Sequence, residues 1–304
     1  MGGNQLPELN QLPELLPSWY RALRGANRSP KTIASYHLAA TQLIDFFRDQ
    51  GLPIAADKID TDSIRAFLEK VVATRASATA RQRYASLKQL FRWLYEEGEI
   101  PADPMTRIKP PAMQESPVPV LSDDVLRKLL VVASGKTFEE RRDEAIIRLF
   151  VDSGIRLAEM AGLQLDQVDL DLEVAVVLGK GRRLRSVPFG KKTTTALDRY
   201  VRIRRSHPEA ESPALWLGRK GPLTGTGVAQ MLRRRGKDAG VEGLHPHQFR
   251  HTMAHRWLSA GGTEGDLQRL AGWASPQMLR RYGASAADQR AREAHKRLGL
   301  GDQL

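Results

Sequence analysis

The chain carries basic, acidic and hydroxyl side chains at spacings that suit chemistry on an anionic group. They are Arg156 with Glu159, Lys180 between two glycines, His247 with Arg250, Trp273 after Leu-Ala-Gly, and Tyr282 after Arg281. Arginine is the preferred donor to a phosphate because its planar fork matches two oxygens at once. Phosphoryl transfer also needs a nucleophile and an acid for the leaving oxygen. Arginine, tyrosine and lysine side chains meet these needs.

Two of these segments are ambiguous when each is taken alone. Glu159 lies one helical turn after Arg156, where its carboxylate would hold the guanidinium in place. An ordinary surface ion pair is the alternative. Lys180 is flanked by Gly179 and Gly181, so it would reach outward as a general acid or a phosphate contact. A simple hairpin loop is the alternative.

The histidine-rich segment allows two interpretations. His247 and Arg250 share one face near a helix start, where backbone N–H groups favour anions. His247, His251 and His255 also have the spacing of a metal-binding helix. We favour the phosphate interpretation and expect no metal, because arginines interleave the histidines and the chain has no cysteine.

Tyr282 needs help to act as a nucleophile. A free phenol has a pKa of about 10, and neighbouring cations favour its phenolate. Arg281 directly precedes it, and Arg280 stands one residue earlier. The alternative is an interfacial tyrosine.

The N-terminal part of the chain predicts a small helical domain. Ser29-Pro30 is a cap and first-turn pair, Thr61 can cap a second helix, and a third runs from about 77 to 97, ended by Gly98. A short helix near Trp19 would make the fourth. The outer face of the third helix carries Arg81 and Lys88, which would meet phosphates or base edges; a merely solvated basic face is the alternative.

A proline-rich segment separates this domain from the rest. Six of the 17 prolines are Pro101, Pro104, Pro110, Pro111, Pro117 and Pro119. Proline fixes φ and disfavours helix in the preceding residue, so the stretch predicts an extended linker. We expect a helical domain over 1–107, a linker over 108–119 and a second domain over 120–304.

The second domain is predicted to be mainly helical with a small β-sheet. Strands are expected at 173–178 and 184–189, joined by a Gly-Lys-Gly-Arg-Arg turn. Helices are expected near 122–134, 138–152, 193–207, 226–240, 247–260 and 285–298, the first capped by Ser122.

Composition limits the partners and the compartment. Lys plus Arg number 47 against 35 Asp plus Glu, a net charge of +12, which fits a nucleic-acid partner. With no cysteine, disulfides and thiol nucleophiles are excluded. No apolar run approaches the roughly 20 residues that span a bilayer, and the N-terminus has no signal-peptide core. We expect no membrane association and action in the cytoplasm.

The order and spacing of the motifs resemble the signature of the tyrosine recombinases (phage integrases and Xer proteins). The resemblance covers nearly the whole chain and implies a core-site DNA-binding domain followed by a catalytic domain. It implies that Arg156 and Arg250 clamp the scissile phosphate and that Lys180 protonates the leaving 5′ oxygen. His247 would assist proton transfer, Glu159 would support the site, and Tyr282 would form a 3′-phosphotyrosyl bond.

One residue departs from the commoner family pattern. Trp273 stands where most members carry histidine, although tryptophan is a known alternative. Indole only donates, so Trp273 would bond a phosphate oxygen and pack on Tyr282 without shuttling a proton.

The resemblance further implies the assembly and its partners. Four protomers would act on double-stranded DNA with paired core sites, through a Holliday junction, without a cofactor; an accessory protein that controls direction is also allowed. The segment from about 286 to 304 resembles a helix that docks into a neighbouring protomer. Side chains of the helical domain, with Arg233, Arg234 and Arg235, are expected to contribute to DNA recognition. The biological task would be integration or excision of a mobile element, or dimer resolution.

Two alternatives remain at this level. A type IB topoisomerase uses similar residues but relaxes DNA as a monomer. A catalytically silent DNA-binding protein on the same fold would lack a catalytic residue, and here only Trp273 departs from the common pattern.

Overall fold

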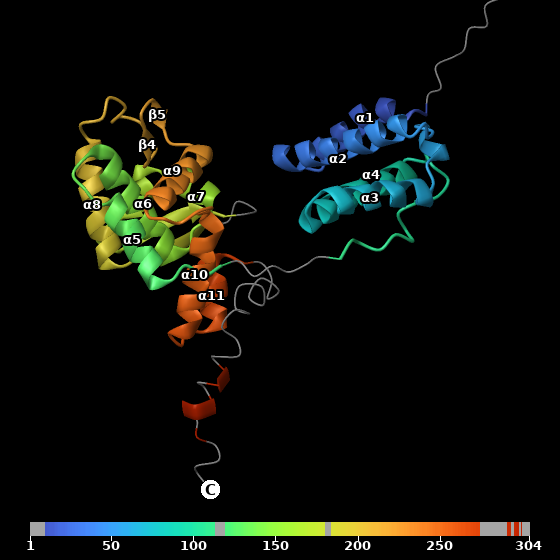
Figure 1. The fold of residues 1–304 in the computed structure, drawn as a ribbon. Helices are drawn as coiled ribbons and strands as arrows, with labels where there is room; N and C mark the ends of the chain where they lie inside the picture. Colours follow the sequence, from blue (N-terminus) through green and yellow to red (C-terminus); the bar gives the residue numbers. More distant parts are fainter. Residues whose placement is uncertain are drawn as a thin grey trace, which may run out of the picture. The chain divides into compact units, whose positions relative to one another are not determined.

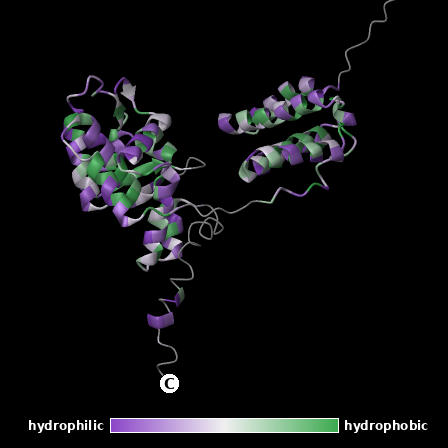
Figure 2. Cartoon of the chain, viewed as in Figure 1, coloured by the Kyte–Doolittle hydropathy of each residue, from purple (hydrophilic) through white to green (hydrophobic). Residues whose placement is uncertain are grey.

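A computed structural model describes residues 10–112, 119–179, 184–273, 291–292, 295–297 and 299 of the 304-residue chain. The chain divides into two compact units, Met1–Ser116 and Pro117–Leu304 (Figure 1). In both units, apolar residues line the inner faces of the helices and hydrophilic residues the outer faces (Figure 2). None of the described helices is long and apolar enough to cross a bilayer.

The described residues of the first unit form four α-helices and one 3-10 turn. They are α1 (Leu12–Gly25), α2 (Pro30–Asp49), η1 (Ala56–Lys58), α3 (Thr61–Thr74) and α4 (Ser77–Glu96). The predicted start of α2 is confirmed, because the Ser29 side chain accepts a hydrogen bond from the Thr32 amide. The predicted cap of α3 is wrong by one residue. Asp60 is the cap, and its carboxylate accepts from the Ser63 amide.

The core of this unit is aromatic and aliphatic. Trp19 of α1 stacks on Tyr36 of α2, and Phe47 and Phe91 are fully buried between α2 and α4. The helix near Trp19, predicted to be short, extends over 14 residues. Its Pro17 lies inside the helix, where the sequence pattern alone favours a break.

The proline-rich segment that begins at Pro101, expected to be extended, is not extended throughout. Residues 104–107 form turns, and Met105 and Ile108 are buried in the core of the first unit. The Ile108 carbonyl accepts a hydrogen bond from the buried Tyr84 hydroxyl. These apolar side chains stabilise the segment against the helices by burial, which outweighs the extended preference of the prolines.

The second unit has seven described α-helices, a 3-10 turn and two small sheets. The helices are α5 (Asp123–Ala133), α6 (Phe138–Ser153), α7 (Leu157–Gly162), α8 (Lys191–Arg204), α9 (Gly225–Asp238), α10 (Pro246–Ser259) and α11 (Glu264–Ala271). The turn η2 is Leu165–Gln167. The predicted cap Ser122 is confirmed at α5. The helix expected at 285–298 falls largely outside the described residues.

The predicted hairpin is confirmed. β2 (Val174–Leu178) pairs antiparallel with β3 (Leu184–Pro188), and β1 (Val168–Asp169) joins the same sheet. β4 (Leu217–Gly218) and β5 (Gly221–Pro222) form a second, two-stranded sheet. The sequence did not predict β1, β4, β5 or α11, because two-residue strands and an eight-residue helix show too little periodicity.

Helix α6 is the centre of this unit. It packs against α5, α8 and α10, and Phe150 of α6 stacks on Phe249 of α10 with ring centroids 5.6 Å apart. Its N-terminus is fixed by a capping box, in which Thr137 and Glu140 bond each other's backbone amides. Its C-terminus ends at Gly154, in the left-handed conformation. The chain thus turns directly from a rigid buried helix into the segment that carries Arg156.

Candidate active site

Arg156 is placed by the junction between α6 and α7. Gly154 has φ +54°, a conformation that favours glycine, and a Cβ there would lie 3.3 Å from Arg250 Cα, so glycine eases the close packing of α10. Arg156 then caps α7, and its amide donates to Glu159 Oε2 at 3.0 Å. Its Nη1 donates to Glu159 Oε1 at 2.8 Å. The predicted Arg156–Glu159 contact is therefore confirmed.

Arg250 comes from the second turn of α10 and is buried. Its Nη1 donates to the Gly154 carbonyl at 2.8 Å, and its Nη2 to the Ala271 carbonyl. A buried guanidinium needs such acceptors, since an unpaired one would lose its hydration without compensation. Arg250 therefore ties the end of α6 to the end of α11.

The end of α11 collects three arginines on three consecutive carbonyls. Leu270 accepts from Arg185, Ala271 from Arg250, and Gly272 from Arg156, the last at 2.7 Å. The last carbonyls of a helix have no partner within the helix and carry partial negative charge. Consecutive Cα atoms are about 3.8 Å apart, so guanidiniums from three distant parts of the sequence converge on a few ångströms of backbone.

Gly272 makes this convergence sterically feasible. It ends α11 with φ +61°, a conformation that favours glycine. A Cβ at this position would lie 2.9 Å from Arg185 Cδ and 3.5 Å from Arg156 Nη1. The glycine in Leu-Ala-Gly-Trp273 therefore leaves room for Arg185, while Arg156 would still be at ordinary contact distance.

Glu159 joins two of the arginines through one carboxylate. Besides Arg156, it accepts from Arg185 Nη2 at 2.6 Å through Oε2. Burial raises the pKa of Glu159. The hydrogen bond from the Arg156 amide, the charge of Arg185 and the side-chain hydrogen bonds of both arginines lower it by more. The pKa of Glu159 therefore lies below its usual range. The carboxylate stays ionised and balances part of the charge at the site.

Trp273 follows directly and is buried. The Arg250 guanidinium lies over its ring, 5.3 Å from the centroid, within the range of a cation–π interaction. The structure thus groups four of the predicted residues: Arg156, Glu159, Arg250 and Trp273.

His247 lies in the first turn of α10 and is exposed. Its ring stacks on that of His245, with centroids 5.2 Å apart. The His245 side chain also accepts from the His247 amide at 3.3 Å. For the metal-binding alternative, three or more side chains of metal-ligating types would have to lie together. Among the described residues, no such cluster is found.

Lys180 and Tyr282, the predicted acid and nucleophile, lie outside the described residues. The strands that flank the lysine segment are described up to Gly179 and from Leu184, whose Cα pairs with that of Leu178.

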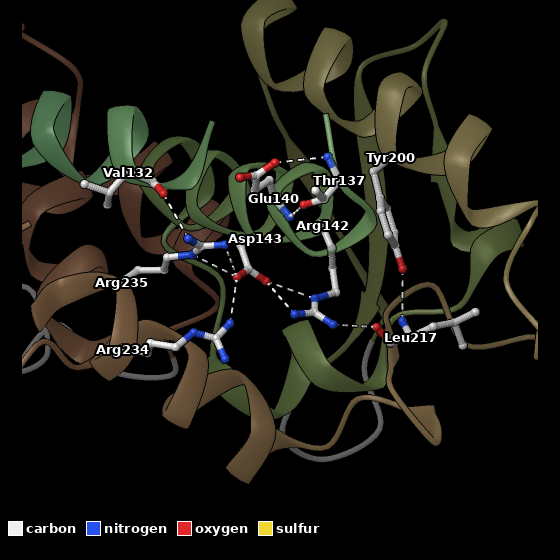
Figure 3. A network of polar contacts seen from close by, with 9 residues as sticks. All are labelled: Val132, Thr137, Glu140, Arg142, Asp143, Tyr200, Leu217, Arg234 and Arg235. Atoms are coloured by element: carbon white, nitrogen blue, oxygen red, sulfur yellow. Dashed lines mark hydrogen bonds and ion pairs between the residues drawn. The ribbon is translucent and has the colours of Figure 1, made fainter. Parts of the chain in front are cut away.

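The predicted DNA-binding residues differ in their surroundings. Arg81 and Lys88 of α4 and Arg233 of α9 are exposed. Arg234 and Arg235 instead bind Asp143, a fully buried carboxylate of α6 (Figure 3). The side chain of Arg235 is only 13% exposed and also donates to the Val132 carbonyl at 2.9 Å. Arg235 therefore has a structural role that the sequence did not indicate.

Two residues of these networks were missed by the sequence reasoning. Arg185 stands after Arg182 and Arg183, and nothing in the sequence distinguishes it from them. Its alternation with the buried Val187 in β3 was the only available signal. Asp143 lies among several charged residues of α6, where a surface position was the simpler interpretation.

Comparison with known proteins identifies the class. Residues 119–289 match the phage integrase family, and residues 15–98 match the phage integrase N-terminal SAM-like domain. Tyrosine recombinase XerC of Pseudomonas fluorescens is 30% identical over 246 residues, which cover 80% of this chain and 82% of that protein. XerC of Corynebacterium efficiens is 31% identical over 277 residues, covering 88% and 85%.

Solved structures support the same fold. The Tn1549 transposon integrase in complex with transposon right end DNA has a TM-score of 0.76 at 19% identity, covering 95% of this chain and 99% of that chain. XerH recombinase bound to palindromic difH substrate has a TM-score of 0.74 at 19% identity, covering 97% and 91%. The chain belongs to the phage integrase family, and it is a site-specific tyrosine recombinase.

Proposed function

We propose that Arg156 and Arg250 bind the scissile phosphate of DNA while the Tyr282 hydroxyl attacks its phosphorus. A P–O bond forms to the tyrosine, the bond to the 5′ oxygen breaks, and Lys180 gives that oxygen a proton. His247 assists proton transfer at the tyrosine, and Trp273 donates to a phosphate oxygen. In rejoining, a 5′ hydroxyl attacks the phosphotyrosine and releases the tyrosine, so the number of phosphodiester bonds is conserved.

The convergence of Arg156 and Arg250 on neighbouring carbonyls carries this proposal. Donors fixed before the reaction stabilise charge that develops in the transition state without reorganising. Both nitrogens of Arg156 that bind protein acceptors carry a second hydrogen. The Arg156 side chain is 32% exposed, which leaves it accessible to an incoming phosphate.

The remaining functional assignments follow the family. Residues 1–107 act as the core-site DNA-binding domain with Arg81 and Lys88 on the DNA, 108–119 as the linker, and 120–304 as the catalytic domain. Four protomers assemble on two duplexes with paired core sites, exchanging C-terminal helices and passing through a Holliday junction. The reaction takes place in the cytoplasm, on DNA of a mobile element or a chromosome dimer, and an accessory protein sets its direction.

The test is covalent trapping. Wild-type protein and Tyr282→Phe are incubated with labelled plasmid carrying the DNA that flanks the gene, then quenched with detergent. We expect DNA joined to protein at a 3′ end with wild type and none with Tyr282→Phe, since phenylalanine has no oxygen to attack. Tyr95→Phe, which alters an exposed tyrosine of α4, is the matched control and should behave as wild type.

Three outcomes would contradict the proposal. Covalent product from Tyr282→Phe would show that another residue is the nucleophile. DNA binding without any product from wild type on the flanking DNA would argue for a silent binding protein. Plasmid relaxation without recombinant product would favour a topoisomerase-like activity.

A further inference from the structure

We infer that Arg185 is a positioning residue for the phosphate-binding arginines. It would act through Glu159 and the end of α11, not by touching the DNA. This inference rests on the proposed function, because it assigns to Arg185 the task of holding Arg156 for phosphate binding.

Arg185 lies in β3, paired with Val177 of β2. Its side chain is 11% exposed, against 32% for Arg156. Both terminal nitrogens of Arg185 donate to acceptors within the protein. Its contacts are therefore internal.

Two internal contacts define what Arg185 holds. Nη2 donates to Glu159 Oε2 at 2.6 Å, and Nη1 donates to the Leu270 carbonyl. The first fixes the carboxylate that grips Arg156. The second fixes the last turn of α11, whose next two carbonyls accept from Arg250 and Arg156. One side chain thus holds an acceptor of Arg156 and the helix end whose carbonyls accept from Arg156 and Arg250.

The geometry of the fork explains why an arginine stands here. Its planar group presents two nitrogens in fixed relation, and these reach a side chain of α7 and a carbonyl of α11 at once. An ammonium is a single point of charge and would reach both acceptors poorly. Nε of Arg185 is buried and has no acceptor among the residues the structure describes.

Glu159 gives the coupling its electrostatic basis. Its carboxylate is held ionised with the two arginines on its two oxygens. Without Arg185, one oxygen of a buried carboxylate loses its charged donor, and the Arg156 guanidinium becomes the only charged partner on the side chain. Arg156 would then follow the carboxylate to a new position. A shift of about 1 Å in a positioned group is enough to slow a reaction about 100-fold.

The experiment compares Arg185→Gln and Arg185→Lys with wild type. The matched control is Arg202→Gln, which removes the same charge from an exposed ion pair of α8. Each protein is saturated with a DNA duplex on which wild type forms the Tyr282-linked product, and the rate of product formation is measured. The same duplex is also prepared with a methylphosphonate at the scissile position, which removes one charged oxygen.

We expect Arg185→Gln to lower the rate on ordinary DNA by about 10- to 100-fold, with DNA affinity close to wild type. The rate of Arg185→Lys should lie between those of Arg185→Gln and wild type, and the rate of Arg202→Gln should match wild type. On the methylphosphonate, the gap between Arg185→Gln and wild type should narrow, because a neutral group depends less on placed cations. A variant that is merely less well folded would be slowed alike on both substrates.

The possible failures are distinct. If wild type forms no Tyr282-dependent product on any tested DNA, the proposed function is wrong. If wild type reacts and Arg185→Gln reacts equally fast, Arg185 positions nothing that matters to the reaction. An equal deficit on both substrates would also overturn the inference, since the side chain would then be structural. If Arg185→Gln does not fold, Arg185→Lys, which keeps the charge, decides by the same criteria.

Discussion

Two buried carboxylates in the second unit each gather arginines, and they do so for different ends. Asp143 of α6 binds Arg142, Arg234 and Arg235, while Glu159 of α7 binds Arg156 and Arg185. The first network extends to the carbonyl of Leu217 in β4, and the second to the end of α11. Strand β4 and helix α11 lie at opposite ends of the unit (Figure 1).

The networks differ in what they leave accessible. Around Asp143, Arg142 and Arg235 are turned inward and bond backbone carbonyls, closing the contacts between α5, α6, α9 and β4 (Figure 3). Around Glu159, Arg185 is turned inward but Arg156 stays partly accessible. A similar ionic arrangement therefore stabilises packing at one end and holds a partly accessible cation at the other. Counting ion pairs would not separate these roles; the exposure and the remaining acceptors do.

The largest effect is expected from Asp143→Ala. It leaves three arginines without their shared anion, of which Arg142 is buried and Arg235 largely so. Removing one partner of a buried ion pair destabilises by about 3–5 kcal/mol. Thermal unfolding should therefore shift down by about 10 °C.

Asp198→Ala is the control for this change. It breaks an exposed i,i+4 pair with Arg202, and such pairs contribute less than about 1 kcal/mol. Equal shifts for Asp143→Ala and Asp198→Ala would remove the structural role assigned to the Asp143 network.

In contrast to Asp143→Ala, Glu159→Gln should affect the reaction rate more than the stability. The amide keeps the shape but loses the charge that holds Arg156 and Arg185, so the rate of covalent product formation should fall by about 10- to 100-fold, or about 1.4–2.8 kcal/mol in the barrier. Rates are measured at saturating DNA, with Asp143→Asn as the matched acid-to-amide change. If both variants fold and Asp143→Asn loses more rate than Glu159→Gln, the contrast between the two carboxylates is wrong.

Glu159 should also leave a signature in the pH dependence of stability. Its folded pKa is lowered, so its contribution is fully present above its ordinary value of 4.5 and is lost as pH falls through the lowered value. The difference in unfolding free energy between wild type and Glu159→Gln should therefore shrink below that pH. Denaturant titrations at a series of acidic pH values measure it, and a constant difference would argue against the lowered pKa.

The smallest effect is expected from Arg234→Gln. Its side chain is 52% exposed, so its pair with Asp143 is partly screened and contributes less than about 1 kcal/mol. If Arg234 also contacts a phosphate, the salt dependence of DNA binding should weaken by about one unit of slope. Binding measured over a salt series decides this, with Arg202→Gln as reference. An unchanged slope would leave Arg234 a member of the structural network alone.

Local signals in the sequence predicted much of the framework. Ser29 and Ser122 cap their helices as expected, because a cap depends on residues three positions away. The Arg156–Glu159 contact was predictable for the same reason, since i,i+3 neighbours on a helix always lie close. The hairpin followed from alternation and glycines.

Packing overruled local preference in other places. Pro17 lies within a helix because α1 is held by its apolar face, and Met105 and Ile108 draw the start of the proline-rich segment into a core. Arg235, one of three identical residues in a row, turns inward because a buried carboxylate from a distant helix meets it there. Sequence spacing does not encode such a partner.

By itself, the sequence determined the family, the order of the two domains and which side chains are candidates for the reaction. Motif types and their order suffice for that, because they are properties of the chain. Only the tertiary structure decided which arginine stays partly accessible and which closes a core. It alone brought Arg185 to Glu159 and aligned three arginines on the last carbonyls of α11. The physical reason is that each of these contacts joins residues from separate elements, whose distance and burial are set by the packing of the whole unit.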